Sequence, residues 1–175
     1  HNGLPGPEPM LVDVSGSLLA DPFLVIEFIE GTSEIPSTQE GLCIDLMADM
    51  LAQIHALPIA DLPTLPMRIN PLPEVFDYLP ESKEWQYLLA HLRSLSDTEY
   101  VELPKLLHGD YWPNNLLWRN DSIASVIDWE DAAIGDPLSD VACCRLELRY
   151  KFGKQSMHRF TQAYAKYRAI DYDRL

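Results

Sequence analysis

The stretch HGDYWPNN at residues 108–115 decides the fold, and two further short motifs follow it closely. VIDWE occupies residues 126–130, and GDPLSD occupies residues 135–140. A single match of this length would be a weak signal, because isolated Asp residues are usually loop or cap residues. Three ordered motifs with consistent spacing form a strong signal for a functional site.

The first motif places Asp110 five positions before Asn115. This is the spacing of the kinase catalytic loop, H-R-D-x-x-x-x-N. Phosphoryl transfer needs a carboxylate that positions and deprotonates the attacking hydroxyl, and metal ligands that neutralise the triphosphate. A tight loop can direct Asp110 toward the nucleophile and Asn115 toward the metal.

The second motif places Asp128 at the end of an apolar strand, thirteen residues after Asn115. A position just beyond a hairpin is where the kinase fold carries its main magnesium ligand. Magnesium prefers one or two carboxylates together with phosphate and water oxygens. Asp128 and Asn115 are therefore chemically sufficient for a Mg²⁺ site.

Composition narrows the classes of partner. The 175 residues carry a formal net charge of −14, which argues against nonspecific binding to nucleic acid or to an anionic membrane. The same acidity mildly favours a cationic substrate. Three cysteines, two of them adjacent, suggest free thiols in a reducing cytoplasm rather than a disulfide framework. No signal peptide or membrane-spanning stretch is recognisable in the sequence.

Periodicity and turn chemistry predict strands first and then mostly helices, with one hairpin inserted among the helices, which is an α+β pattern. Ser37 and Glu40 have the spacing of a capping box at the start of the first helix, and His55 near the end of that helix is expected to be a packing or capping residue. The predicted elements are a hairpin over residues 10–31 ending in a largely buried strand at 22–31, a helix from the capping box to Pro58, a non-helical proline-rich excursion at 58–81, a helix at 82–95, a short strand at 106–107, a hairpin at 116–127, a helix opened by Asp136 and Pro137, and a last helix at 154–168.

Taken together, H-G-D-x-x-x-x-N, I-D-W-E and G-D-P-x-x-D closely resemble the motifs of the aminoglycoside phosphotransferase and choline-kinase-like family. Gly109 in place of Arg, and Trp-Glu in place of Phe-Gly after Asp128, favour this family over the protein kinases. Residues 24–31 resemble its interlobe hinge, and residues 51–57 resemble its first large C-lobe helix. The resemblance covers essentially the whole chain and is densest over residues 106–142.

The resemblance implies a role for each matching residue. Asp110 would be the catalytic base, and Asn115 and Asp128 would bind Mg²⁺. The hinge backbone at Glu27 and Ile29 would bind the adenine of ATP (or GTP), with Ile26 as gatekeeper. Structural support of the site would come from His108, which holds the loop in shape, from Asp136, which caps the following helix, and from Asp140, which braces the loop through hydrogen bonds.

The resemblance also implies a protein-kinase-like fold with two parts. Residues 1–31 would be a remnant of the N-lobe, with its last strands and the hinge. Residues 32–175 would be a mostly helical C-lobe in which a short β-hairpin carries the catalytic segment. The glycine-rich phosphate loop, the lysine-bearing strand and the last C-terminal helices of the family are not found in the sequence. We therefore expect these 175 residues alone to be inactive.

The leading hypothesis is a small-molecule kinase that transfers the γ-phosphoryl of ATP or GTP to a hydroxylated acceptor resembling an aminoglycoside, choline or an amino alcohol. The alternative is a non-catalytic pseudo-kinase module that binds a nucleotide or another ligand. The presence of Asp110, Asn115 and Asp128 argues against the alternative, because a non-catalytic protein has no physical need for all three. Metal-dependent hydrolysis is poorly supported, since the sequence has no His-rich or paired-carboxylate metal motif.

Overall fold

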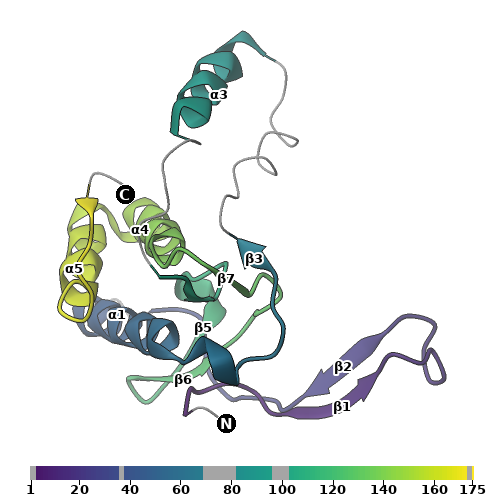
Figure 1. Ribbon diagram of the computed structural model, residues 1–175. Coiled ribbons are helices and arrows are strands. Elements are labelled where there is room, and N and C mark those ends of the chain that lie inside the picture. Colours follow the sequence, from purple (N-terminus) through teal and green to yellow (C-terminus); the bar gives the residue numbers. More distant parts are fainter. Residues whose placement is uncertain (1–2, 36–37, 69–81, 96–102, 173–174) are drawn as a thin grey trace.

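Three helices and a set of short strands surround the hydrophobic core of the protein (Figure 1). The structure is a computed structural model that describes residues 3–35, 38–68, 82–95, 103–172 and 175. The elements are β1 (Pro9–Asp13), β2 (Phe23–Ile26), α1 (Glu40–Ala56), β3 (Met67–Arg68), α3 (Lys83–Leu95), β4 (Lys105–Leu107), β5 (Leu116–Arg119), β6 (Ser122–Val126), β7 (Ala133–Gly135), α4 (Leu138–Phe152) and α5 (Lys154–Tyr164), with 3-10 turns at Ile59–Asp61 and Pro113–Asn115.

Helix α1 is the central element of the core. It packs against α5 on one side and contacts β4 and β6 on the other. The apolar side chains that recur every three or four residues along one face are buried, with Leu46 half-buried, and His55 is buried beside them. Its start differs from the prediction, because Gln39 is the N-cap residue and makes no side-chain cap. Glu40 instead accepts a short hydrogen bond from Ser156 and so ties α1 to α5. Ser37 lies outside the described residues.

Helices α4 and α5 form the second side of the core, packed against each other and, through α5, against α1. Gly153 separates the two helices with φ of 88°, a left-handed conformation that glycine adopts without strain. The prediction extended α5 to residue 168, but the helix ends at Tyr164 and the chain continues in turns.

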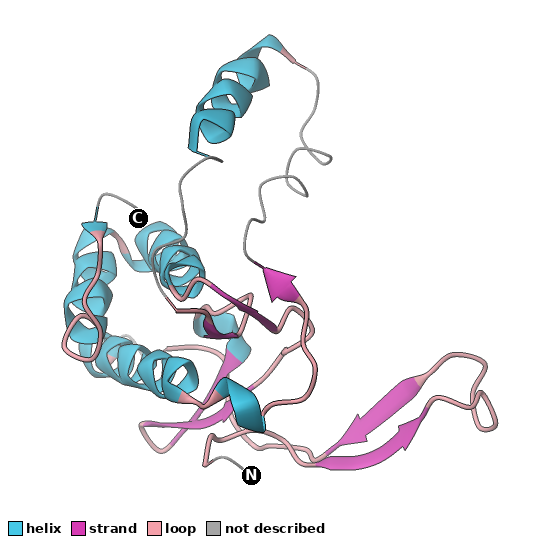
Figure 2. Ribbon diagram, in the orientation of Figure 1, coloured by secondary structure: helices cyan, strands magenta, loops and turns pink. Residues whose placement is uncertain are grey.

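The short strands form three separate sheets (Figure 2). The hairpin β5–β6 is confirmed, with Leu116 opposite Val126. A three-stranded sheet in the order β3-β7-β4 was not fully predicted, because β3 and β7 are only two and three residues long. Strand β7 runs parallel to β3 and antiparallel to β4, and thereby links the proline-rich segment to the strand that precedes His108. Residues 69–81 of that segment lie outside the described part of the chain.

The hairpin β1–β2 projects away from the core (Figure 1). Its existence is confirmed, but the prediction of a largely buried strand was wrong. Strand β2 has only four residues, and Leu24, Val25 and Ile26 are all exposed. The reason is that a two-stranded ribbon buries apolar side chains only where another layer covers it. No other described element packs extensively against this hairpin.

Helix α3 is confirmed over nearly its predicted length and stands apart from the helical core (Figure 1). Trp85 and Leu88 of its apolar face are each 37% exposed. None of the helices among the described residues is both long and apolar enough to cross a bilayer.

The central position of α1 generates a prediction about stability. Leu51→Ala should lower the free energy of unfolding by about 2–5 kcal/mol, because Leu51 is completely buried and the substitution leaves a cavity. Leu42→Ala on the same helix is the matched control, since Leu42 is 49% exposed and should change stability by less than about 0.5 kcal/mol. Urea denaturation monitored by circular dichroism measures both. Equal effects of the two substitutions would contradict the packing described for α1.

Candidate active site

The carboxylate of Asp110 is held by donors on both oxygens. Oδ2 accepts hydrogen bonds from Asn115 Nδ2 at 3.0 Å and from Trp112 Nε1 at 3.1 Å. Oδ1 accepts from the thiol of Cys143 on α4, with a distance of 3.8 Å from Sγ. Burial, and then the charge of Asp110, raise the pKa of Cys143 to about 12, so this thiol keeps its proton and remains a donor. These donors fix the orientation of the Asp110 carboxylate. The residue is only half-buried and so remains accessible.

The loop closes on itself because Asn115 bonds Asp110 twice. In addition to the carboxylate contact, Asn115 Nδ2 donates to the Asp110 main-chain oxygen at 2.9 Å. The 3-10 turn Pro113–Asn115 returns the chain to make this contact possible. The five-residue spacing of the motif therefore has a direct structural cause. Because the side-chain nitrogen of Asn115 donates to Asp110, the side-chain oxygen Oδ1 is the atom that can bind a cation.

Asn115 and Asp128 are brought together by a main-chain contact between the loop and the end of β6. The amide of Ile127 donates to Asn115 O at 3.0 Å, and Asp128 is the next residue. Asp128 is exposed and has φ of 65°, an uncommon conformation for a residue other than glycine. An unusual backbone at an exposed carboxylate is a feature that clusters at functional sites.

These two side chains fit a Mg²⁺ ion in donor chemistry, since both offer oxygen and one is a carboxylate. In the parts of the chain that the structure describes, no three His, Cys, Asp or Glu side chains form a protein-only metal cluster. A pair of oxygen donors matches the way magnesium is bound when phosphate and water supply its other ligands.

His108 lies beneath the loop as a neutral ring. Its Nε2 donates to Ile127 O at 2.9 Å, because a carbonyl can only accept. Its Nδ1 accepts from the Asp110 amide at 3.3 Å, so this nitrogen carries no proton. Burial lowers the pKa of His108, which is fully buried and packs against Trp129 with 4.6 Å between ring centroids. His108 therefore connects the backbone of the loop to the strand that leads to Asp128.

Asp140 on α4 holds the other side of the loop. Its Oδ2 accepts from the His108 amide at 2.8 Å, and its Oδ1 accepts from the Gly109 amide at 2.9 Å. Oδ2 also accepts from Nε2 of His55 at 3.1 Å. With 1% exposure, this carboxylate is buried and has protein donors on both oxygens.

His55 is the main residue of the site that the sequence analysis missed, since it was assigned only to packing or capping. Its second nitrogen, Nδ1, lies 2.7 Å from the hydroxyl of Tyr164 on α5. A signal existed, because His55 follows Leu51 by four positions and so shares its buried face. The partner could not be inferred, since Asp140 is 85 residues away.

The backbone at Gly109 explains why this loop has glycine at the position where protein kinases have arginine. Its φ is 88°, and a Cβ atom there would lie 2.1 Å from the main-chain oxygen of Asp131. Any larger residue would displace the backbone between Asp128 and β7. Helix α4 begins at Leu138 with Pro137 as its N-cap residue, so Asp136 is not the N-cap as predicted. Asp136 Oδ1 nevertheless accepts from the amide of Leu138 at 2.9 Å.

The segment compared with a hinge joins β2 to the core. The amide of Glu27 donates to Glu8 O at 2.8 Å, and Thr32 forms a bridge with Trp118 of β5. Ile26 is exposed and Ile29 is half-buried. Among the described residues, neither the main-chain oxygen of Glu27 nor the Ile29 amide makes a hydrogen bond, and these are the two groups that the resemblance assigns to adenine. The structure does not bring this segment into hydrogen-bonding contact with Asp110.

The rim of the site next to Asp110 carries a cation that the sequence analysis did not consider. Lys151 Nζ lies 4.6 Å from the centroid of the Trp112 ring and donates to Asn114 Oδ1 at 2.5 Å. A cation over an aromatic face is stabilising. Lys151 thereby orders Trp112, which in turn donates to Asp110.

The fold is that of the aminoglycoside phosphotransferases, which confirms the predicted class. The structure of aminoglycoside phosphotransferase APH(3'')-Id from Streptomyces rimosus, in complex with ADP and streptomycin, matches with a TM-score of 0.77 at 22% identity and covers 99% of this chain and 73% of its own. An aminoglycoside-3'-phosphotransferase of type VIII matches with a TM-score of 0.74 at 22% identity, over 98% of this chain and 71% of its own.

Sequence comparison gives the family directly. The model of the phosphotransferase enzyme family matches residues 1–175, and the chain belongs to this family. Mouse acyl-CoA dehydrogenase family member 10 is 26% identical over 164 residues, and human acyl-CoA dehydrogenase family member 11 is 28% identical over 160 residues. These alignments cover 80% of this chain but only 15% and 20% of the two relatives, so the chain corresponds to a small part of either protein.

The neutral state of His108 generates a prediction about pH. In the unfolded chain His108 takes up a proton as the pH falls below about 6.5, whereas the folded protein keeps the ring neutral because burial lowers its pKa. The unfolded state then binds more protons, so stability falls as the pH decreases through that value. We expect His108 to contribute a loss of up to about 1.4 kcal/mol per pH unit.

The dependence of stability on pH is measured by urea denaturation between pH 7.5 and 5.5, which is about one unit on either side of the histidine pKa in the unfolded chain. His108→Gln should flatten it, and His158→Gln at an exposed histidine should leave it unchanged. An unchanged slope in His108→Gln would contradict this prediction, because it would mean that His108 binds protons equally in the folded and unfolded protein.

Proposed function

We propose that this chain carries the acceptor and metal half of a small-molecule kinase that moves the γ-phosphoryl of ATP, or of GTP, to a hydroxyl group. The observation that carries the proposal is the connection Asp110–Asn115–Ile127–Asp128. One hydrogen bond of 3.0 Å joins the carboxylate of Asp110 to Asn115, and another of 3.0 Å joins Asn115 to the residue before Asp128. A base and two candidate metal ligands thus lie on one short network.

In this proposal Asp110 accepts the proton of the acceptor hydroxyl. The donors Asn115 and Trp112 hold Oδ2, and the weak thiol donor Cys143 is the only recorded donor to Oδ1 within the described residues. A thiol is readily replaced by a stronger donor such as an alcohol, so Oδ1 is the oxygen that we assign to the acceptor. The short, fixed geometry orients the base before the acceptor binds, which reduces the entropic cost of the reaction.

Asn115 Oδ1 and the Asp128 carboxylate would hold Mg²⁺. The ion, when bound, would neutralise charge on the nucleotide phosphates. The residues of this chain keep the two oxygen donors in place, because Asn115 is buried and is fixed through both its amide nitrogen and its main-chain oxygen. Two of the structurally similar aminoglycoside phosphotransferases form complexes with ADP and with AMP-PNP, respectively, which supports a nucleotide as donor.

For the adenine, the proposal uses the main chain of Glu27 and Ile29, with Ile26 beside them. Neither the Glu27 main-chain oxygen nor the Ile29 amide has a hydrogen-bond partner among the described residues, so both groups can pair with a base. We assign residues 1–31 to the end of an N-lobe and residues 32–175 to the C-lobe, since the completely buried core residues all come from the second range. Pro5 nevertheless contacts β6, where it accepts from Val126.

The acceptor is proposed to be a hydroxylated small molecule, and the net charge of −14 favours one that carries a cationic group. Two structurally similar aminoglycoside phosphotransferases form complexes with streptomycin and with hygromycin B, which are hydroxylated small molecules. A cytoplasmic location fits three free cysteines.

The role of Asp110 is tested in the full-length protein with Asp110→Ala. We expect phosphotransfer to hydroxylated amines to fall by at least about 100-fold, since general bases contribute on this scale, with little change in Mg²⁺–nucleotide affinity. Asp121→Asn in the exposed β5–β6 turn is the control and should retain full activity. Phosphotransfer at an unchanged rate in Asp110→Ala would show that Asp110 is not the general base. Nucleotide binding without any transfer by the unaltered protein would favour a binding module.

The metal assignment is tested with Asp128→Ala. Removal of one of the two protein ligands should weaken Mg²⁺–nucleotide binding by at least about tenfold, measured by isothermal titration calorimetry on the full-length chain. Glu130→Ala, two residues further along and also exposed, is the matched control. Equal affinity in the unaltered protein and Asp128→Ala would mean that the metal site lies elsewhere.

A further inference from the structure

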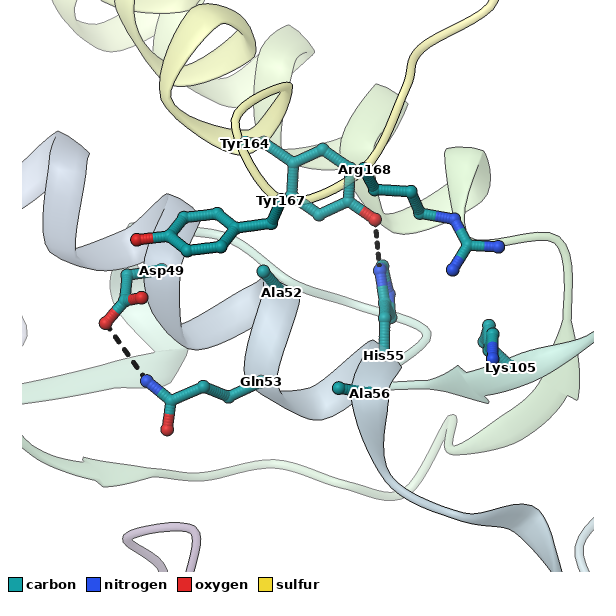
Figure 3. A pocket seen from close by; sticks show the side chains of 9 residues that line it. All are labelled: Asp49, Ala52, Gln53, His55, Ala56, Lys105, Tyr164, Tyr167 and Arg168. Atoms are coloured by element: carbon teal, nitrogen blue, oxygen red, sulfur yellow. Dashed lines mark hydrogen bonds between the residues drawn. The ribbon is translucent and has the colours of Figure 1, made fainter.

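A cavity of about 500 Å³ is lined by His55 and by Tyr164, the partner of His55 Nδ1 (Figure 3). The other ring nitrogen of His55 contacts Asp140. The cavity is open to solvent and is lined by the C-terminal half of α1, by the start of β4 and by the end of α5 with the turn that follows it. None of the residues to which the proposed reaction has been assigned lines it. Its inner wall is the pair His55 and Tyr164, both almost completely buried.

The cavity concentrates positive charge in a strongly acidic protein. Lys105 on β4 and Arg168 after α5 both line it, and Figure 3 shows their side chains on the same side of the cavity, next to His55. The main-chain amide of Arg168 donates to Tyr164 O at 3.2 Å, which fixes the position of this turn. The chain has 13 basic residues against 27 acidic ones, so two in one cavity depart from the overall balance.

The acidic side chain of the cavity is already engaged. Asp49 accepts a hydrogen bond from Gln53 at 3.0 Å and another from the hydroxyl of Tyr167, whose pKa is raised by that contact. Figure 3 shows Asp49 and Gln53 at the far end from Lys105. One end of the cavity carries the basic side chains of Lys105 and Arg168, and the other end carries a hydrogen-bonded acid, an amide and a phenol. The first end suits an oxyanion, because carboxylate and phosphate oxygens accept from Lys and Arg.

Two lining residues of this cavity, Lys105 and His55, connect it to the supports of the catalytic loop. Lys105 is three residues before His108, on the strand that enters the loop. His55 Nε2 bonds the same oxygen of Asp140 that accepts from the His108 amide. A ligand that repositions Tyr164 or His55 changes the charge and geometry presented to Asp140. Asp140 in turn holds the amides of His108 and Gly109.

We propose that this cavity is a regulatory site for a small organic oxyanion, a metabolite bearing a carboxylate or a phosphate, and that its occupancy is transmitted to the catalytic loop through His55 and Asp140. The binding and its transmission rest on the geometry of the cavity alone. The consequence for catalysis rests on the proposed function. The product of that reaction, a phosphate monoester, belongs to the same chemical class, so this site could sense its own product.

The test is hydrogen-exchange mass spectrometry on the full-length protein, with inorganic phosphate and succinate as separate probes at constant ionic strength. At least one probe should slow exchange saturably in peptides containing Lys105 and Tyr167, and also at the His108 and Gly109 amides. If only phosphate or only succinate acts, the ligand is a phosphate or a carboxylate, respectively. The midpoint is the probe concentration that gives half of the maximal protection. Lys105→Gln and Arg168→Gln should each raise this midpoint by about tenfold, the effect of one lost charge-assisted hydrogen bond.

Two controls separate this site from others. Lys154→Gln removes an exposed positive charge on α5 outside the cavity and should leave the midpoint unchanged. Asp128→Asn should also leave it unchanged, although it disables the proposed metal site, so failure of the proposed function does not imitate failure of this inference. Tyr164→Phe should keep the protection of the Lys105 peptide but lose that of the loop amides.

Three results would overturn the proposal. Lack of saturable protection with both probes would show that the cavity binds no oxyanion. Equal midpoints in the unaltered protein, Lys105→Gln and Arg168→Gln would place the anion elsewhere. Protection around Lys105 and Tyr167 without any change at His108 and Gly109 would remove the link to the catalytic loop.

Discussion

The buried carboxylate of Asp140 is the interaction on which the site depends. It accepts from the His108 amide, the Gly109 amide and the ring of His55, and so joins α4, the catalytic loop and α1 at one point. A buried charge is tolerated only when its oxygens have donors, and here both do. Removal of that carboxylate would leave three donors without their acceptor, at a cost well above that of a surface hydrogen bond.

The other contacts of the loop build on this point. With the His108 and Gly109 amides fixed from one side, the His108 ring can bridge Ile127 and the Asp110 amide from the other. The ring must be neutral to make both contacts, and its burial favours that state. Asp110 is then presented with its carboxylate fixed by Asn115 and Trp112. The proposed base and metal ligands thus owe their positions to residues that take no part in the chemistry.

Much of this arrangement could be predicted from sequence because it is local. The spacing of Asp110 and Asn115 reflects a closed turn, and the apolar period of α1 reflects a buried face, so both are visible in short windows. The strands β3 and β7 are too short to show a period, and they form only because distant segments pair. The role of His55 was missed for the same reason, since its two partners lie on α4 and α5.

The burial of β2 was wrongly predicted because an apolar run indicates a strand but not what covers it. The capping box failed in a similar way, since Glu40 finds a partner in α5 and not in its own first turn. In both cases tertiary contacts decide between options that the local sequence leaves open.

The most direct test of this account is Asp140→Asn in the full-length protein, with exchange of the His108 and Gly109 amides and phosphotransfer measured side by side. An asparagine has one oxygen instead of two, and its nitrogen can only donate. The account predicts that amide protection and transfer are lost together while thermal unfolding remains cooperative. Full transfer with unprotected amides would contradict it.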